Sequence, residues 1–249
     1  MTAAEQLARS ERARLGLDEA TPIGDLVHVM EEEAGVHVAL CQLGEQGLAG
    51  LYQMREGIPM ILVNSSVHPV RARFTLAHEH GHHRLGHGAA VDRVIDNTSR
   101  DPLEVDANRF AAELLLPRLG LERWLHEGGD PRIDLEIVVR LANDFGVSCE
   151  VALHRLERTR RVRAAAGRSL AARIEAGEHR DLNWRLGLIE VDDTLARERR
   201  LRFRMPAPTR RAVLRALERG LIDAESAAER LHVDRLEIQR MRRLEPVVD

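Results

Sequence analysis

Residues 73–87 read RFTLAHEHGHHRLGH, and this stretch decides how the rest of the chain is interpreted. Apolar or small residues recur there at intervals of three and four, which predicts a helix over residues 70–86. On that helix His78 and His82 are rotated by only about 40° and displaced by about 6 Å along the axis. Both imidazoles can therefore reach one metal ion, and Glu79 lies beside them.

The spacing HExxH, from His78 to His82, is typical of a metal centre that does chemistry. Neutral imidazole nitrogens bind Zn²⁺ at about 2.0–2.1 Å, and an ion with an open position lowers the pKa of its bound water towards about 7. Glu79 can accept the proton of that water and later hand it to a leaving amine. The motif therefore predicts zinc-dependent hydrolysis, provided that a third ligand exists.

A second predicted helix, from Pro102 to Pro117, offers that ligand. The sequence EVDANRFAAELLLP begins at Glu104, and catalytic zinc sites often take a carboxylate as their third protein ligand. Asn108 follows four residues later on the same helix face, where it can hold a ligand by a hydrogen bond. Asp106 is the alternative ligand, although it points about 200° away from Glu104 on an ideal helix.

Together the two stretches resemble the ImmA/IrrE family of zinc metallopeptidases, whose pattern is RFTLAHE-x-GH followed by E-x-x-AN-x-FA-x-x-LL-x-P. The resemblance extends more loosely over residues 5–158. It implies a zincin-like core in which His78, His82 and Glu104 bind zinc and Glu79 is the general base and acid. It also implies an endopeptidase that makes a limited cut in a helix-turn-helix (XRE-type) repressor encoded nearby, which derepresses stress or mobile-element genes.

The sequence departs from the family pattern at several histidines. His80 stands where the family usually has a bulky apolar residue. His83 and His87 form a second pair spaced by four, but the pair lacks an intervening Glu and lies beside Gly86, where the helix is expected to end. We therefore expect one metal centre, which holds Zn²⁺ or, as the alternative, Mn²⁺.

The group that stabilises the oxyanion is left open by the sequence. Tyr52, which is the only Tyr in the chain, is the candidate that we select, and His80 and His83 are the alternatives by chemistry alone. A zinc that only stabilises the fold is a further alternative. Structural sites are usually closed by a fourth Cys or His, and this motif supplies an adjacent Glu instead.

The fold class predicted from the patterns is α+β. Helical spacing covers residues 3–17 and 23–34, and three β-like runs follow at residues 36–43, 48–54 and 58–63. The turn Arg55-Glu56-Gly57 between the last two runs has the composition of a hairpin, and a polar loop is expected over residues 88–101. We therefore predict a zincin-like core with a small sheet over residues 1–130.

The remainder is predicted to be mainly helical, with two units that resemble helix-turn-helix motifs, at residues 135–159 and 212–243. The predicted divisions are a unit packed on the core (131–160), a linker or regulatory segment (161–205) and a C-terminal helical domain (206–249). The run RERRLRFR at residues 197–204 fits a strand or an exposed helix face equally well. In the last unit Asp234 is placed to cap the final helix.

The charge distribution differs between the two parts of the chain. Residues 1–150 hold 14 Arg against 24 acidic residues, whereas residues 151–249 hold 23 Arg against 16. The last helix could therefore lie in a DNA major groove or dock a protein partner. The candidate contacts are Arg235, Gln239, Arg240, Arg242 and Arg243. A DNA-binding regulator with a structural or silent zinc site is thus the alternative function.

Composition excludes several other classes of protein. No stretch approaches the ~20 apolar residues of a membrane-spanning helix, and the first residues lack the apolar block of an export signal, so a cytoplasmic location without membrane partners is expected. Cys41 and Cys149 are far apart and outside any CxxC spacing, which argues against a thiolate metal site. Aromatic residues make up only 3% of the chain, which disfavours recognition of single strands by stacking.

Overall fold

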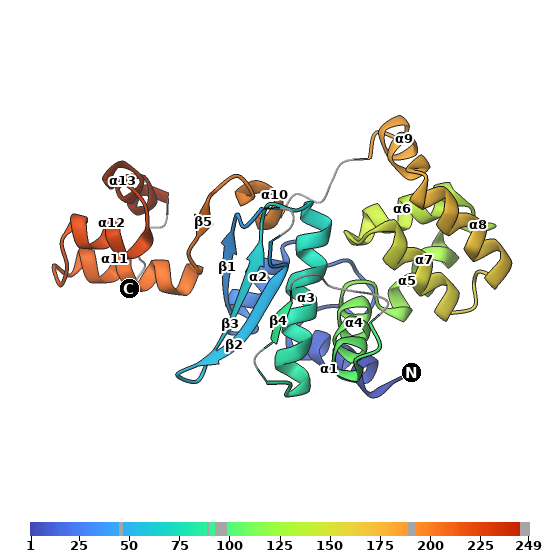
Figure 1. Cartoon of the computed structure of the whole chain (residues 1–249), viewed down its shortest axis with the longest axis horizontal. Coiled ribbons are helices and arrows are strands. Elements are labelled where there is room, and N and C mark those ends of the chain that lie inside the picture. The colour runs from blue at the N-terminus through green and yellow to red at the C-terminus, as the bar shows by residue number, and fades with distance from the viewer. Residues whose placement is uncertain (45–46, 89, 93–98, 189–192, 245–249) are drawn as a thin grey trace.

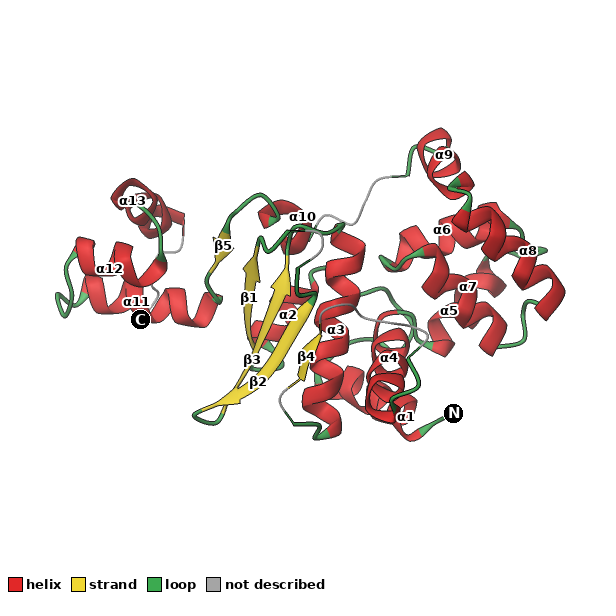
Figure 2. Cartoon of the chain, viewed as in Figure 1, coloured by secondary structure: helices red, strands yellow, loops and turns green. Residues whose placement is uncertain are grey.

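The chain folds as an α+β protein with a small mixed sheet and a largely helical remainder (Figure 2). The computed structural model describes residues 1–44, 47–88, 90–92, 99–188 and 193–244. Within those ranges, no helix is both long and apolar enough to cross a bilayer.

The sheet has the strand order β4-β2-β3-β1-β5. Its central strands β1 and β3 are parallel, and the other neighbouring pairs are antiparallel. The strands are β1 (His37–Cys41), β2 (Gly50–Arg55), β3 (Ile58–Asn64), β4 (Ala90–Asp92) and β5 (Phe203–Arg204). Glu56 and Gly57 join β2 to β3, and both have positive φ, which is the backbone of a type I′ hairpin turn.

Four helices complete the layers around this sheet: α1 (Ala3–Arg14), α2 (Leu26–Glu32), α3 (Pro69–Leu85) and α4 (Pro102–Leu115). Helix α3 packs against β2 and β3 on one side and against α4 on the other, and α4 also packs against α1 (Figure 1). Asp101 caps the N-terminus of α4 by accepting from the backbone N–H of Leu103, and Pro102 occupies the first turn.

Helices α3 and α4 approach closely at Gly81. A Cβ at this position would lie 3.1 Å from a ring carbon of Phe110 and 3.3 Å from the carbonyl oxygen of Ala107. The missing side chain thus lets the two helices come together beside His82, and the helix that carries Glu104 is held against the helix that carries the histidines.

A group of helices follows the core: α5 (Arg118–Glu127), α6 (Leu135–Phe145), α7 (Cys149–Arg158), α8 (Ala164–Glu175) and α9 (Glu178–Arg185). The apolar faces of α6 and α7 belong to the same hydrophobic core as α3 and α4. Gly146 ends α6 in the left-handed conformation, and Ser148 caps α7 by accepting from the backbone N–H of Val151.

Residues 160–205, whose sequence pattern is hard to interpret, are largely structured. They contain α8 and α9, the short helix α10 (Thr194–Glu198) and strand β5, which pairs with β1. Arg73 of α3 binds Asp193 with an N–O distance of 3.0 Å, and both side chains are buried. The run at residues 197–204 therefore ends one helix and forms one edge strand of the sheet.

The C-terminal helices are α11 (Ala207–Glu218), α12 (Ala224–Leu231) and α13 (Arg235–Leu244). They enclose a small apolar cluster of their own that includes Leu231 and Ile238. Asp234 accepts a hydrogen bond of 2.8 Å from the backbone N–H of Glu237, so the cap expected for the final helix is present.

The loop predicted over residues 88–101 contains an element that the sequence pattern does not indicate. Strand β4 pairs with β2 through the register Leu51↔Val91. A three-residue strand is too short for a periodic signal, and its pairing is made with residues about 40 positions earlier, so this part of the loop prediction was wrong. Residues 89 and 93–98 of that loop lie outside the described residues.

Candidate metal centre

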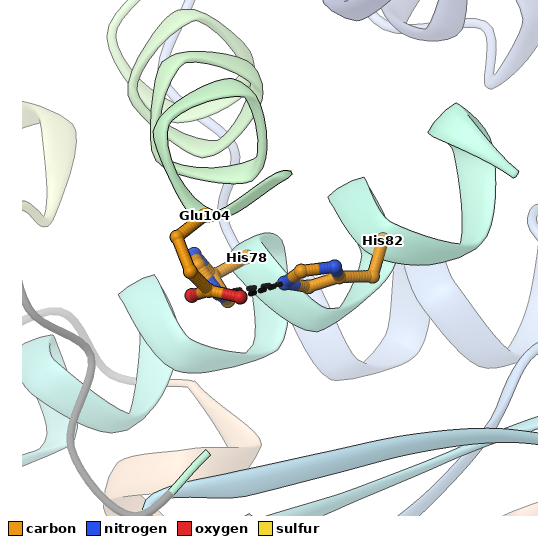
Figure 3. Close-up of side chains that lie close together, drawn as sticks. All are labelled: His78, His82 and Glu104. Carbon is orange, nitrogen blue, oxygen red and sulfur yellow. Dashed lines mark hydrogen bonds and ion pairs between the residues drawn. The ribbon is translucent and has the colours of Figure 1, made fainter. Parts of the chain in front are cut away.

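Three side chains from two helices converge on one point. His78 and His82 extend from successive turns of α3, and Glu104 comes from the first turn of α4 (Figure 3). The Nε2 atoms of the two histidines are 3.0 Å apart. Oε2 of Glu104 lies 3.2 Å from Nε2 of His78, and Oε1 of the same carboxylate lies 3.3 Å from Nε2 of His82.

These distances fit a divalent ion of the zinc type. Bonds of 2.0–2.1 Å at tetrahedral angles separate neighbouring ligand atoms by about 3.3 Å, which is close to the N–N distance and to the distance from each histidine to its nearer carboxylate oxygen. Two imidazole nitrogens and one carboxylate oxygen are also a donor set that suits zinc. Among the described residues this trio is the group of His, Cys, Asp and Glu side chains that could hold a metal.

The other ring nitrogen of each histidine faces a hydrogen-bonding partner. Nδ1 of His78 lies 2.9 Å from Oδ1 of Asn108, and Nδ1 of His82 lies 2.9 Å from Nδ1 of His87. A carbonyl-type oxygen accepts only, so Nδ1 of His78 carries the proton. With His87 accepting in the same way, both Nε2 atoms present lone pairs to the centre, as metal ligation requires.

Glu79 is fully buried and faces the sheet at the start of β2. A Cβ built on Gly50 would lie 2.4 Å from Oε1 of Glu79 and 2.6 Å from Cγ2 of Thr75, so only glycine leaves room for this carboxylate. Sequence reasoning missed Gly50. The available signal is a glycine inside a predicted strand, which often marks the close approach of another group.

Tyr52 shares the α3-facing side of β2 with Gly50, because alternate residues of a strand point the same way. Its hydroxyl lies 3.0 Å from Nδ1 of His83. Burial raises the pKa of Tyr52 and lowers the pKa of His83, so both groups are neutral near pH 7. His83 faces Tyr52 and His87 faces His82, so the second histidine pair does not converge on one point.

His80 contacts a different part of the protein. Its Nε2 lies 2.8 Å from Oε1 of Glu11 on α1, and both side chains are fully buried. Burial lowers the pKa of His80 despite the neighbouring carboxylate, which favours a neutral ring that donates to Glu11. His80 thus joins α1 to α3 and points about 200° from His78 around the helix.

The remaining candidate residues lie apart from the centre. The carboxylate of Asp106, the alternative ligand, is half-exposed and lies 3.3 Å from Nη1 of Arg109. On α13 Arg235 forms an ion pair of 2.7 Å with Glu225 of α12. The exposed residues of α13 include all five candidate contacts, namely Arg235, Gln239, Arg240, Arg242 and Arg243.

Comparison with known proteins finds a family match that contains the helices of the candidate metal centre. The sequence model of the family described as Peptidase M78, IrrE N-terminal-like domain, matches residues 31–157, which include α3 and α4. The chain is also 36% identical over 72 residues to a protein of Bacillus phage phi105 named "Uncharacterized immunity region protein 2". That match covers 28% of this chain and 46% of the phage protein, so the chain spans about half the length of this relative. Because the family match covers half of the sequence and contains the candidate centre, the chain belongs to the Peptidase M78 family of IrrE N-terminal-like domains.

Proposed function

We propose that this protein is a zinc-dependent endopeptidase that makes a limited cut in a helix-turn-helix transcriptional repressor. The observation that carries the proposal is the convergence of His78, His82 and Glu104, with the buried carboxylate of Glu79 next in sequence to the first ligand. Membership of a peptidase family agrees with this assignment.

In this proposal the two histidines and Glu104 hold the metal, and Asn108 orients His78. A bound zinc ion supplies Lewis acidity, which polarises the scissile carbonyl and makes a water molecule a better nucleophile. Mn²⁺ is the alternative ion for the same donors.

Glu79 is the general base and then the general acid. It removes the proton of the attacking water and delivers it to the nitrogen of the leaving amine. Its carboxylate is buried against Gly50, where only glycine leaves room for it, and this contact keeps the carboxylate in one position, as proton transfer requires. Tyr52 is the proposed donor to the oxyanion, because its side chain lies on the same side of β2 as Gly50, which Glu79 faces.

The family resemblance and the phage relative support the proposed substrate class. The name of that relative places it in a phage immunity region, which agrees with a substrate among repressors. A single cut in such a repressor, encoded near this protein, would derepress stress or mobile-element genes.

The deciding experiment compares the wild type with Glu79→Gln on a purified repressor encoded beside the gene. We expect the variant to retain zinc and its circular dichroism spectrum and to lose cleavage by about 10²–10⁴-fold. A chelator should abolish cleavage by the wild type, and added zinc should restore it. Equal cleavage by Glu79→Gln would contradict the proposed mechanism.

A second candidate function is DNA binding by α11–α13. It is favoured by the exposed face of α13, which carries four Arg and one Gln around the buried Ile238. The argument is weakened by Glu225, which already neutralises Arg235. Binding to duplex DNA that survives Glu79→Gln and falls steeply with salt would support this function, because phosphate contacts release counterions.

A further inference from the structure

A cavity of about 260 Å³ lies between α4 and α7 and is separate from the three metal-binding side chains. Its apolar wall is formed by Phe74 of α3, Val105 and Ala112 of α4, and Val151 of α7. An apolar void of about 150 Å³ already accepts a molecule of the size of benzene. The space is therefore sufficient for one large side chain.

The cavity is linked to the candidate metal centre through one shared residue, on the Nδ1 side of His78. Asn108 belongs to its wall and also lies 2.9 Å from His78. Phe74 precedes His78 by one turn on the same face of α3, a distance of about 6 Å along the axis. Successive residues of an extended peptide are about 3.4 Å apart, so a substrate bound at the centre would bring the side chain of a residue beside the scissile bond to this cavity.

The guanidinium groups of the cavity wall are paired within the protein, and Glu150 and His154 are the other ionisable residues of the wall beside Glu5. Arg155 is buried and binds Glu113, and it also lies 3.7 Å from Glu5. Arg158 binds Glu5 with an N–O distance of 2.6 Å, and Arg109 binds Asp106 at 3.3 Å. Because these guanidinium groups are neutralised, the cavity offers little to an anionic ligand, and its apolar wall decides what it takes.

We propose that this cavity receives a bulky apolar side chain of the peptide substrate, from a residue next to the bond that is cut. The inference rests on the proposed peptidase function and adds the specificity of the site. It also gives α7, which belongs to the first helix-turn-helix-like unit, a role as one wall of the substrate site. A cavity of this kind typically discriminates by about 10–200-fold between side chains that differ by a methylene or a methyl group.

The test uses the full-length, zinc-loaded protein and a mixture of synthetic dodecapeptides of random sequence. Sequencing of the pooled products gives the residue preference on each side of the cut. We expect the wild type to favour large apolar residues at one position. Ala112→Phe fills the cavity and should lower that preference by about tenfold or more, whereas Phe74→Ala enlarges it and should shift the preference towards larger side chains.

Ala172→Phe is the matched control, because Ala172 is exposed on α8. It should leave the preference unchanged. The two cavity variants change the volume of the cavity in opposite directions, so one folded variant is enough to test the inference. The thermal midpoint and the zinc content show which variant is folded. Preferences identical to the wild type in a folded cavity variant would overturn the inference while the proposed function stands. Cleavage of the purified repressor that is equally absent from the wild type and Glu79→Gln would overturn both.

Discussion

The ring of His87, which lies just beyond the end of α3, meets the ring of His82 edge-on, with the two Nδ1 atoms 2.9 Å apart. The backbone N–H of His87 also donates to the carbonyl oxygen of His82, at 3.0 Å. Gly86 makes this geometry possible, since it ends the helix with φ of 72°, in the left-handed region where glycine is favoured. A helix C-cap thus returns the chain over one of the candidate metal ligands.

The first prediction concerns this contact. His87→Ala removes the acceptor of Nδ1 of His82, so the ring loses its fixed orientation and tautomer. We expect the affinity for zinc to fall by about 10–100-fold, as measured by competition with a chelating dye. His126→Ala changes an exposed histidine of α5 and should leave the affinity unaltered. An unchanged affinity in His87→Ala would show that the contact does not orient the ligand.

A second prediction concerns the contact between Gly50 and the carboxylate of Glu79. In Gly50→Ala the new methyl group would lie 2.4 Å from Oε1 of Glu79, which forces the carboxylate to move. We expect cleavage to fall by about 10²-fold, because small displacements of a catalytic group are costly, while zinc affinity stays within a factor of two. Gly24→Ala is the control, since its added methyl group meets no atom within 4 Å. Full activity in Gly50→Ala would argue against the role of Glu79.

The third prediction concerns the buried carboxylate of Glu11. Burial alone would raise its pKa, but hydrogen bonds from Arg14 and His80 and the charge of Arg84 hold it well below the ordinary value of 4.5. As the pH falls below 4.5, the carboxylate of Glu11 is therefore protonated in the unfolded chain before it is protonated in the folded protein. The stability contributed by Glu11 is fully present above that pH and is lost as the pH falls towards the pKa of the folded state.

We expect Glu11→Gln to lower the free energy of unfolding by about 1–3 kcal/mol near neutral pH, because buried donors lose a charged acceptor. The difference from the wild type should shrink steadily below pH 4.5. Urea unfolding of the zinc-free protein between pH 3 and 7 measures this without a contribution from metal release. Glu127→Gln changes an exposed carboxylate and should show no such dependence. A difference that is independent of pH would contradict the assignment.

The fourth prediction concerns the attachment of the C-terminal helices. Arg204 of β5 and Glu31 of α2 form a buried, bidentate ion pair with both N–O distances at 2.8 Å. Glu31 also accepts from the backbone N–H of Ala207, at the start of α11. Glu31→Ala removes the bidentate carboxylate of a buried guanidinium and leaves it only the ion pair with Glu198 at 2.5 Å. We therefore expect a loss of about 1.5–3 kcal/mol and faster proteolysis near residue 206.

An exposed ion pair between the same two parts of the chain provides the control. Arg211 lies 2.7 Å from Glu32, with more than a third of each side chain exposed. Glu32→Ala should cost no more than about 1 kcal/mol by urea unfolding. Similar losses for the two variants would mean that burial of the Arg204 pair contributes nothing.

Local features of this protein were predictable from the sequence because they depend on neighbours along the chain. Helical periodicity alone brings His78 and His82 onto one face, and their Nε2 atoms are 3.0 Å apart in the structure. The same holds for the caps at Asp101 and Asp234, whose side chains bind the backbone two or three residues further on.

The tertiary structure decided what depends on residues far apart in sequence. The contact of Glu11 with His80 spans 69 positions, and that of Glu31 with Arg204 spans 173, so no local pattern records them. The space for Glu79 at Gly50 likewise exists only once β2 lies against α3. Periodicity specifies which side chains share a helix face, whereas the packing of sheet and helices determines what that face meets.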